Sequence, residues 1–150
     1  MNYKDQKVKF KNKRLVCIDF GLKRCGIAVC DEFHITSSPR GLLIYNSAGF
    51  WNELINILLN EKPAAIIVGV PIRLDGLKTK LIEEIEKFIV ELSVKSNLEV
   101  ISYDESFSSK IATQTMIEIG IKKKKRSRKG STDKIAACVI LRDFLNEMDN

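Results

Sequence analysis

Two short stretches of the sequence are apolar at almost every position, and each of them ends at a turn. Residues 64–70 read Ala-Ala-Ile-Ile-Val-Gly-Val, and residues 15–18 read Leu-Val-Cys-Ile just before Asp19. Runs of this length without alternating polar residues are typical of parallel strands that are buried on both faces. Such a sheet needs helices on both of its faces, so this feature predicts an α/β fold.

The rest of the chain alternates between strand and helix patterns. The expected elements are strands at 15–19, 25–30 and 41–45, a helix from about 49, a strand at 64–70, a helix over about 80–95, a strand at 98–103, a helix at 110–119, and a last helix through 148 that Ser131 or Thr132 caps. The third strand follows a turn signal at 37–39. Right-handed crossovers then predict a mixed five-stranded sheet in the order 3-2-1-4-5, with helices on both faces.

Length and composition suit one domain over residues 1–150, in which the polar, lysine-rich residues 1–13 form a flexible lead-in. Four cysteines form no Cys-x-x-Cys pair, so we expect free thiols and no zinc cluster. No segment approaches the roughly 20 apolar residues of a membrane span. The first lysines are not followed by the apolar run of a secretory signal. We therefore expect a cytoplasmic protein that does not bind a membrane.

The positive charge is concentrated in one segment. The chain has a net charge of +6, but residues 122–129 hold seven of its 25 basic residues and no acid, which leaves 18 basic and 19 acidic residues elsewhere. A basic segment can hold a phosphate backbone, although a charge run alone is more often a solvated loop. The predicted nucleic-acid contacts are Arg24, Lys122, Lys123, Lys124, Lys125, Arg126, Arg128, Lys129 and Lys134.

Three acidic residues fall where this fold would bring them to one rim. Asp19 closes the first buried strand, Glu105 follows the strand at 98–103, and Asp133 precedes the alanines at 136–137 on the packed face of the last helix. Ligands of such sheets bind beyond the carboxyl ends of the parallel strands. Each acid alone is more typical of a turn or a helix N-terminus. Together they are a set of oxygen ligands for Mg²⁺ or Mn²⁺, which predicts metal-assisted phosphodiester hydrolysis.

Four segments carry the motifs of one known family. They are Asp19-Phe20-Gly21-Leu22-Lys23-Arg24-Cys25-Gly26, Gly69-Val70-Pro71 with Asp75-Gly76, Tyr103-Asp104-Glu105, and Asp133-Lys134-Ile135-Ala136-Ala137. In this order, over about residues 14–146, they resemble the D-x-G-x-K-R-x-G, G-x-P…DG, aromatic-D-E and D-K-x-A-A motifs of the YqgF family, also called RuvX. Its members are RNase H-like proteins related to Holliday-junction resolvases.

The resemblance implies an RNase H-like nuclease that processes the 5′ end of pre-16S rRNA. By motif position it also implies catalytic and metal-binding roles for Asp19, Glu105 and Asp133. One position departs from the pattern, because the family usually has an arginine after the D-E pair and this chain has Ser106. A guanidinium there would orient a carboxylate or hold a phosphate, so the departure bears on substrate grip more than on metal binding. Lys110 is a candidate substitute.

Three other interpretations stay open. A Holliday-junction resolvase would use the same acids but would need a dimer to cut two strands symmetrically. A non-catalytic nucleic-acid-binding module could share the fold, although it would have no need of three convergent acids. A sugar-kinase-like or actin-like phosphotransferase also opens with a strand and an Asp-x-Gly turn, but the sequence has no Walker-type glycine loop. The expected partner is RNA or branched DNA, and the sequence leaves the oligomeric state open.

Overall fold

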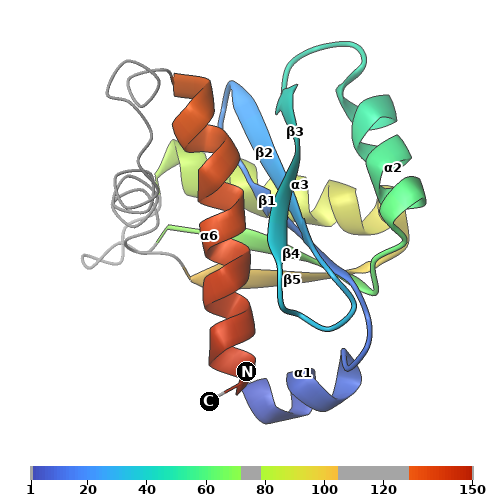
Figure 1. Cartoon of the computed structure of the whole chain (residues 1–150). Helices are drawn as coiled ribbons and strands as arrows, with labels where there is room; N and C mark the ends of the chain where they lie inside the picture. The colour runs from blue at the N-terminus through green and yellow to red at the C-terminus, as the bar shows by residue number, and fades with distance from the viewer. Residues whose placement is uncertain (1, 72–78, 105–128, 150) are drawn as a thin grey trace.

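The computed structural model describes residues 2–71, 79–104 and 129–149 of the chain, with side chains from residue 135 onward in the last range. Its centre is a five-stranded sheet in the order β3-β2-β1-β4-β5, which confirms the predicted order (Figure 1). The strands are β1 (Leu15–Asp19), β2 (Arg24–Cys30), β3 (Ser37–Ile44), β4 (Ala65–Val70) and β5 (Glu99–Asp104). β1 pairs antiparallel with β2 and parallel with β4, and β4 pairs parallel with β5.

Helices cover both faces of the sheet, as predicted. They are α1 (Tyr3–Lys9), α2 (Phe50–Glu61), α3 (Lys80–Ser96) and α6 (Lys129–Asp149). The side chains of α2 and α3 belong to one apolar cluster, and those of α6 belong to a second cluster on the opposite face, where α1 also lies. No helix in the described part of the chain is long and apolar enough to cross a membrane.

β1 shows why the sequence is apolar at every position there. Val16 and Ile18 belong to the cluster under α2 and α3, while Leu15 and Cys17 belong to the cluster under α6. Successive side chains of a strand point to opposite faces, so a central strand covered on both sides needs apolar residues throughout. All four of these side chains are fully buried.

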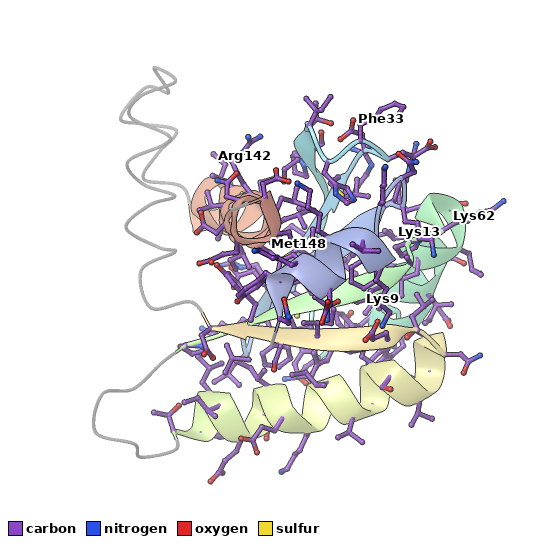
Figure 2. All side chains as sticks on the ribbon, turned by 90° about the horizontal axis from the view of Figure 1, so that it is seen from below. Lys9, Lys13, Phe33, Lys62, Arg142 and Met148 are labelled. Atoms are coloured by element: carbon purple, nitrogen blue, oxygen red, sulfur yellow. The ribbon has the colours of Figure 1, made fainter. Side chains whose placement is uncertain are left out.

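Residues 3–9 form a helix where the sequence predicts a flexible lead-in. The Asn2 side chain caps α1 by accepting hydrogen bonds from two backbone N–H groups, that of Lys4 at 3.0 Å and that of Asp5 at 3.4 Å. Tyr3 packs edge-on against Phe144 of α6, with ring centroids 6.0 Å apart. Seen from below, α1 lies beside the end of α6 that carries Met148 (Figure 2).

Two element boundaries differ from the prediction. β3 begins at Ser37 rather than at residue 41, because Pro39 is accommodated within the strand opposite Ala28, next to a register shift. Proline is tolerated at such irregularities of an edge strand, which has a free side. α6 begins at Lys129, so the predicted caps at 131–132 lie inside the helix. The predicted helix at 110–119 falls outside the described residues.

Candidate active site

Asp19 lies at the carboxyl end of the central strand β1, as predicted. Its backbone pairs with Gly26 of β2, which has no side chain to cover the neighbouring position. By strand alternation from Leu15 and Cys17, its side chain belongs to the face that α6 covers. Asp19 is partly exposed, whereas the four residues before it are buried. The strand therefore ends with a carboxylate at the rim of the core.

The turn after Asp19 is anchored in the opposite face of the sheet. Phe20 is 5% exposed, and its ring centroid lies 4.7 Å from that of Tyr45 and 4.8 Å from that of Phe88. At Gly21, an added Cβ would lie 2.5 Å from the backbone oxygen of Arg24, so the tight turn excludes any larger residue. The sequence motif includes Phe20 and Gly21, but sequence reasoning did not identify them as the residues that position Asp19.

The thiol nearest to this turn is held in its neutral form. Cys25 Sγ lies 3.9 Å from the Gly21 oxygen, to which it donates. Burial, with a smaller contribution from the charge of Asp19, raises the pKa of Cys25 to about 12. A protonated thiol is neither a nucleophile nor a metal ligand. Cys25 also belongs to the apolar cluster under α2 and α3, on the opposite face of the sheet from Asp19, so its thiol packs in the core.

β5 brings a second acidic segment to the same edge of the sheet. In the parallel register, Ile18 of β1 lies level with Val68 of β4 and with Ser102 of β5. Adjacent strands are about 4.8 Å apart, so the ends of β1 and β5 are separated by about 10 Å. Asp104 ends β5 and is exposed. The predicted ligand Glu105 follows it directly in the chain but lies outside the described residues.

Tyr103 marks the side of β5 that faces α6. Its ring packs edge-on against Phe144 at 5.6 Å. Burial, and then the nearby charges of Glu147 and Asp143, raise the pKa of Tyr103 to about 12. The phenol is therefore neutral at physiological pH, and it packs rather than acting as a base.

α6 carries the third predicted ligand in its first turns. Asp133 lies in the helix as predicted, but its side chain is outside the described set. The packed face expected from the sequence is confirmed, since Ala136, Ala137 and Ile140 are no more than 5% exposed. Figure 1 shows that α6 begins at the end of the molecule where β1 turns into β2. The helix that bears Asp133 thus packs on the face of Asp19.

The predicted phosphate contacts are only partly described. Arg24 begins β2, on the same face as Gly26 and Ala28 by alternation, and therefore on the face of Asp19. The residues Lys122, Lys123, Lys124, Lys125, Arg126 and Arg128 lie outside the described residues, as do Ser106 and Lys110. Lys129 and Lys134 belong to α6, and their side chains are not described.

The described side chains do not by themselves form a metal site. Among them there is no group of three or more His, Cys, Asp or Glu residues that could hold an ion, and only Asp19 of the three predicted ligands is included. The chemistry of the donor set nevertheless fits a hard cation, because all three predicted ligands are carboxylates. The described cysteines are free thiols, and those in β1 and β2 are buried.

The arrangement of the sheet and helices defines the class of the protein, which is RNase H-like. Thermus thermophilus RuvC in complex with a Holliday junction substrate superposes with a TM-score of 0.57 at 13% identity, over 92% of this chain and 97% of that chain. A second structure of Thermus thermophilus RuvC gives a TM-score of 0.52 at 12% identity, over 91% and 96%. At these identities the likeness shows the fold alone.

The family follows from the sequence comparisons. A model of the RuvX family, described as Holliday junction resolvase, matches residues 13–147. Relatives from Flavobacterium johnsoniae and Chlorobium phaeobacteroides are each 37% identical, over 89% and 92% of this chain and 96% and 95% of their own lengths. Both carry the curated name "Putative pre-16S rRNA nuclease". The chain belongs to the RuvX family, as its four motifs predict.

Proposed function

We propose that this RuvX-family nuclease hydrolyses phosphodiester bonds in the cytoplasm, at the 5′ end of pre-16S rRNA, with a divalent metal ion as cofactor. The observation that carries the proposal is Asp19, a carboxylate at the carboxyl end of the central strand and on the face where α6 packs. The names of its relatives support the choice of RNA. The family supports hydrolysis rather than simple binding.

The proposed ligands of the metal are Asp19, Glu105 and Asp133. Bound Mg²⁺ or Mn²⁺ would activate a water molecule and stabilise the charge of the leaving oxygen. Phe20 and Gly21 hold the turn that orients Asp19, as described above. The proposed phosphate contacts are Arg24, Lys134 and the basic segment 122–129, which would hold the backbone of the substrate next to the acids.

Cleavage of branched DNA is the second candidate function, and the description of the matching family favours it. A resolvase must cut two strands symmetrically, so it acts as a dimer. A processing nuclease acting on one RNA strand has no such requirement. The oligomeric state and the preferred substrate therefore separate the two candidates.

The deciding experiment compares purified protein with an Asp19→Asn variant on labelled pre-16S rRNA 5′ precursor and on a four-way DNA junction. Each reaction is run with Mg²⁺, with Mn²⁺ and with EDTA. We expect metal-dependent cleavage of the RNA precursor and a loss of about 10²–10³-fold in the variant, because a metal ligand supplies several kcal/mol of charge stabilisation.

Asp149→Asn is the matched control, since Asp149 is exposed and pairs with the exposed Lys7 at 3.3 Å. This variant should cleave at the wild-type rate. Faster cleavage of the DNA junction than of the RNA would favour the second candidate function, that of a resolvase. Binding of RNA without cleavage in any metal would contradict the nuclease and favour the binding module.

A further inference from the structure

A polar cleft of about 600 Å³ opens at the amino ends of β1 and β4. Its charged lining residues are Lys13, Arg14, Glu32, Glu61 and Lys62. β1 runs from this cleft to Asp19, and its four residue steps span about 13 Å. The cleft therefore lies at the opposite end of the central strand from the proposed catalytic acids, and none of the proposed catalytic roles uses it.

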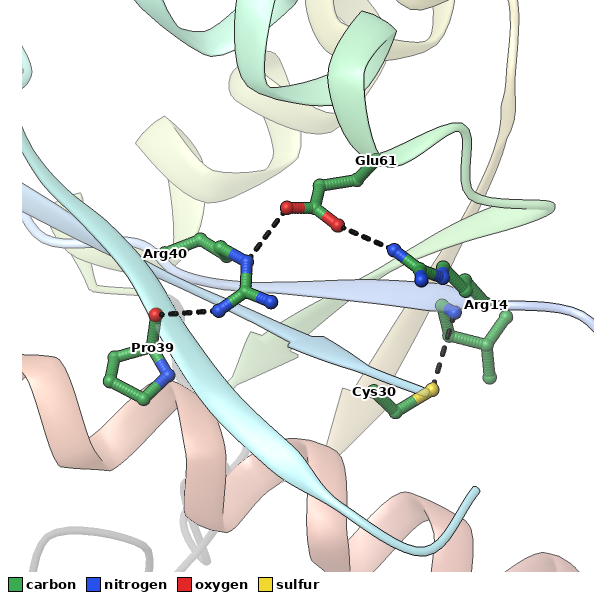
Figure 3. Close-up of polar contacts among 6 residues, drawn as sticks. Arg14, Cys30, Pro39, Arg40 and Glu61 are labelled. Carbon is green, nitrogen blue, oxygen red and sulfur yellow. Dashed lines mark hydrogen bonds and ion pairs between the residues drawn. The ribbon is translucent and has the colours of Figure 1, made fainter. Parts of the chain in front are cut away.

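The cleft has an excess of positive charge that its own acids do not neutralise. Glu61 is shared by two arginines, since its Oε2 accepts from Arg14 Nη1 at 3.0 Å and its Oε1 accepts from Arg40 Nε at 2.7 Å (Figure 3). The Glu61 side chain is only 13% exposed, so this carboxylate is committed to the two guanidinium groups. Lys13 and Lys62 are exposed and make no salt bridge within the described part of the chain.

An exposed aromatic ring stands on the turn next to the cleft. Phe33 is 70% exposed, between β2 and β3, and its neighbour Glu32 lines the cleft. The turn is braced by Asp31 Oδ1, which accepts from the N–H of Ile35 at 2.6 Å and from that of Thr36 at 2.9 Å. These backbone hydrogen bonds, that of Thr36 first, lower the pKa of Asp31. The ring is therefore presented to solvent by an ordered segment.

A side chain ties this turn to the cleft. His34 Nε2 donates to the backbone oxygen of Lys13 at 2.7 Å, and His34 itself has the left-handed backbone conformation, with φ 60°. In Figure 2, Phe33, Lys13 and Lys62 all lie to the same side of α6. This hydrogen bond therefore holds the turn that carries Phe33 at a set position relative to the backbone of Lys13, at the edge of the cleft.

We propose that Lys13, Lys62 and Phe33 form an accessory site for single-stranded RNA. Proteins that bind single strands combine cations that follow the backbone with aromatic rings on which bases stack. Phe33 supplies an exposed ring on the turn that His34 ties to Lys13. Lys13 and Lys62, which make no salt bridge among the described residues, line the neighbouring cleft and supply the cations. The inference rests on the proposed function, because it assigns the site to a part of the RNA substrate distant from the cleaved bond.

The test measures RNA binding without cleavage, in the Asp19→Asn protein, by fluorescence anisotropy of labelled single-stranded RNAs of about 6 to about 24 nucleotides. Lys13→Glu with Lys62→Glu should weaken binding of the longest RNA about tenfold or more. The slope of log affinity against log salt should fall by about 1.4, for two lost phosphate contacts. The loss should grow with RNA length, because only a long strand reaches from Asp19 to the cleft.

The aromatic part of the site is tested separately. Phe33→Leu should weaken binding about 5- to 10-fold through the loss of stacking, whereas Phe33→Tyr should retain the affinity. The charge control is Lys80→Glu with Lys87→Glu on α3, which should bind like the parent protein. All of these side chains are exposed, and thermal unfolding should confirm that the variants fold.

Wild-type affinity of the Lys13/Lys62 variant for long RNA would overturn the proposal. Equal RNA affinities of the Phe33→Leu and Phe33→Tyr variants would overturn the proposal as well. The exposed ring would then be better explained as a contact for an apolar surface of a partner protein. Failure of the nuclease proposal looks different, because wild-type protein would then cleave no RNA while the binding losses persisted. Cleavage of RNA with no binding loss in any variant would leave the nuclease proposal standing and remove the accessory site.

Discussion

The two faces of the central sheet are built from different kinds of side chain. Under α2 and α3, a connected group of aromatic rings lies among the aliphatic side chains, and Phe88 lies within 4.8–6.2 Å of four other rings. Under α6, small side chains are buried among the larger ones, and they include Cys17, Ala28 and Cys30 of the strands and Ala137 of the helix. Large rings fill space and fix positions, whereas small residues let a helix approach a sheet closely.

This difference explains how one short turn can be held firmly and still expose an acid. Phe20 inserts into the aromatic face, and Asp19, the residue before it, falls on the α6 face by strand alternation. Packing on one side of the sheet therefore orients a carboxylate on the other side. The packing of Phe20 under α2 and α3 (the aromatic face) sets the position of the turn, and the carboxylate of Asp19 lies on the face that α6 covers (the α6 face).

Phe20→Ala should have the largest effect on the difference between the two faces. The variant removes a 5% exposed ring from the aromatic cluster and leaves a cavity, which should lower the free energy of unfolding by about 3–4 kcal/mol. For a chain of this length the melting temperature should fall by about 10 °C, as measured by thermal unfolding. The matched control is Phe33→Ala at an exposed ring, which should change stability by no more than about 0.5 kcal/mol. Equal losses in both variants would show that the aromatic face does not anchor the turn.

The parts of the fold that the sequence predicted are those governed by strong local patterns. Strands buried on both faces are apolar at every position, and right-handed crossovers then leave one strand order. α1 was not predicted, because its sequence YKDQKVK is polar and its stability comes from the Asn2 cap and from the contact of Tyr3 with Phe144 of α6, at the other end of the chain. The start of β3 was not predicted, because Pro39 is typical of a turn unless the strand is an edge.

The sequence predicts the position of a candidate site residue only where the neighbouring residues alone determine it. Asp19 follows a buried run, so the end of the strand was evident from the sequence. The roles of Asp19, Glu105 and Asp133 as metal ligands stay predictions. The cleft at the amino ends of β1 and β4 could not be predicted, because Lys13, Glu32 and Lys62 come from separate segments and only the fold brings them together.

Gly21→Ala tests the link between the two faces. The added Cβ would lie 2.5 Å from the Arg24 oxygen, so the turn must shift and carry Asp19 with it. A misplacement of about 1 Å can cost about 10²-fold in rate, and we expect a loss of this size in the rate of RNA cleavage. The free energy of unfolding should fall by only about 1–2 kcal/mol. Gly49→Ala is the control, since its Cβ would meet Glu53 Oε1 at an ordinary 3.5 Å. A Gly21→Ala variant with wild-type cleavage would show that the turn does not set the position of the acid.

The smallest expected effect concerns a charge on the α6 face. Burial, and then the charge of Glu147 one helical turn away, raise the pKa of Asp143 above its usual value. A carboxyl group whose pKa is raised in the folded protein holds its proton more tightly there than in the unfolded chain, so its ionisation destabilises the fold. This cost is absent below the unfolded pKa and is fully present once the pH exceeds the folded pKa.

Asp143→Asn should therefore raise the melting temperature at pH 7 by about 1–3 °C, and the gain should shrink as the pH falls below the usual carboxyl range. Glu147→Gln is the companion variant. This variant removes the charge of Glu147, which is the second cause of the raised pKa, and leaves Asp143 buried. Its melting temperature should therefore rise by less than that of Asp143→Asn at the same pH. A melting temperature for Asp143→Asn that is unchanged or lower at pH 7 would mean that Asp143 has a stabilising partner on this face. The α6 face would then resemble the aromatic face, in holding its side chains by specific contacts.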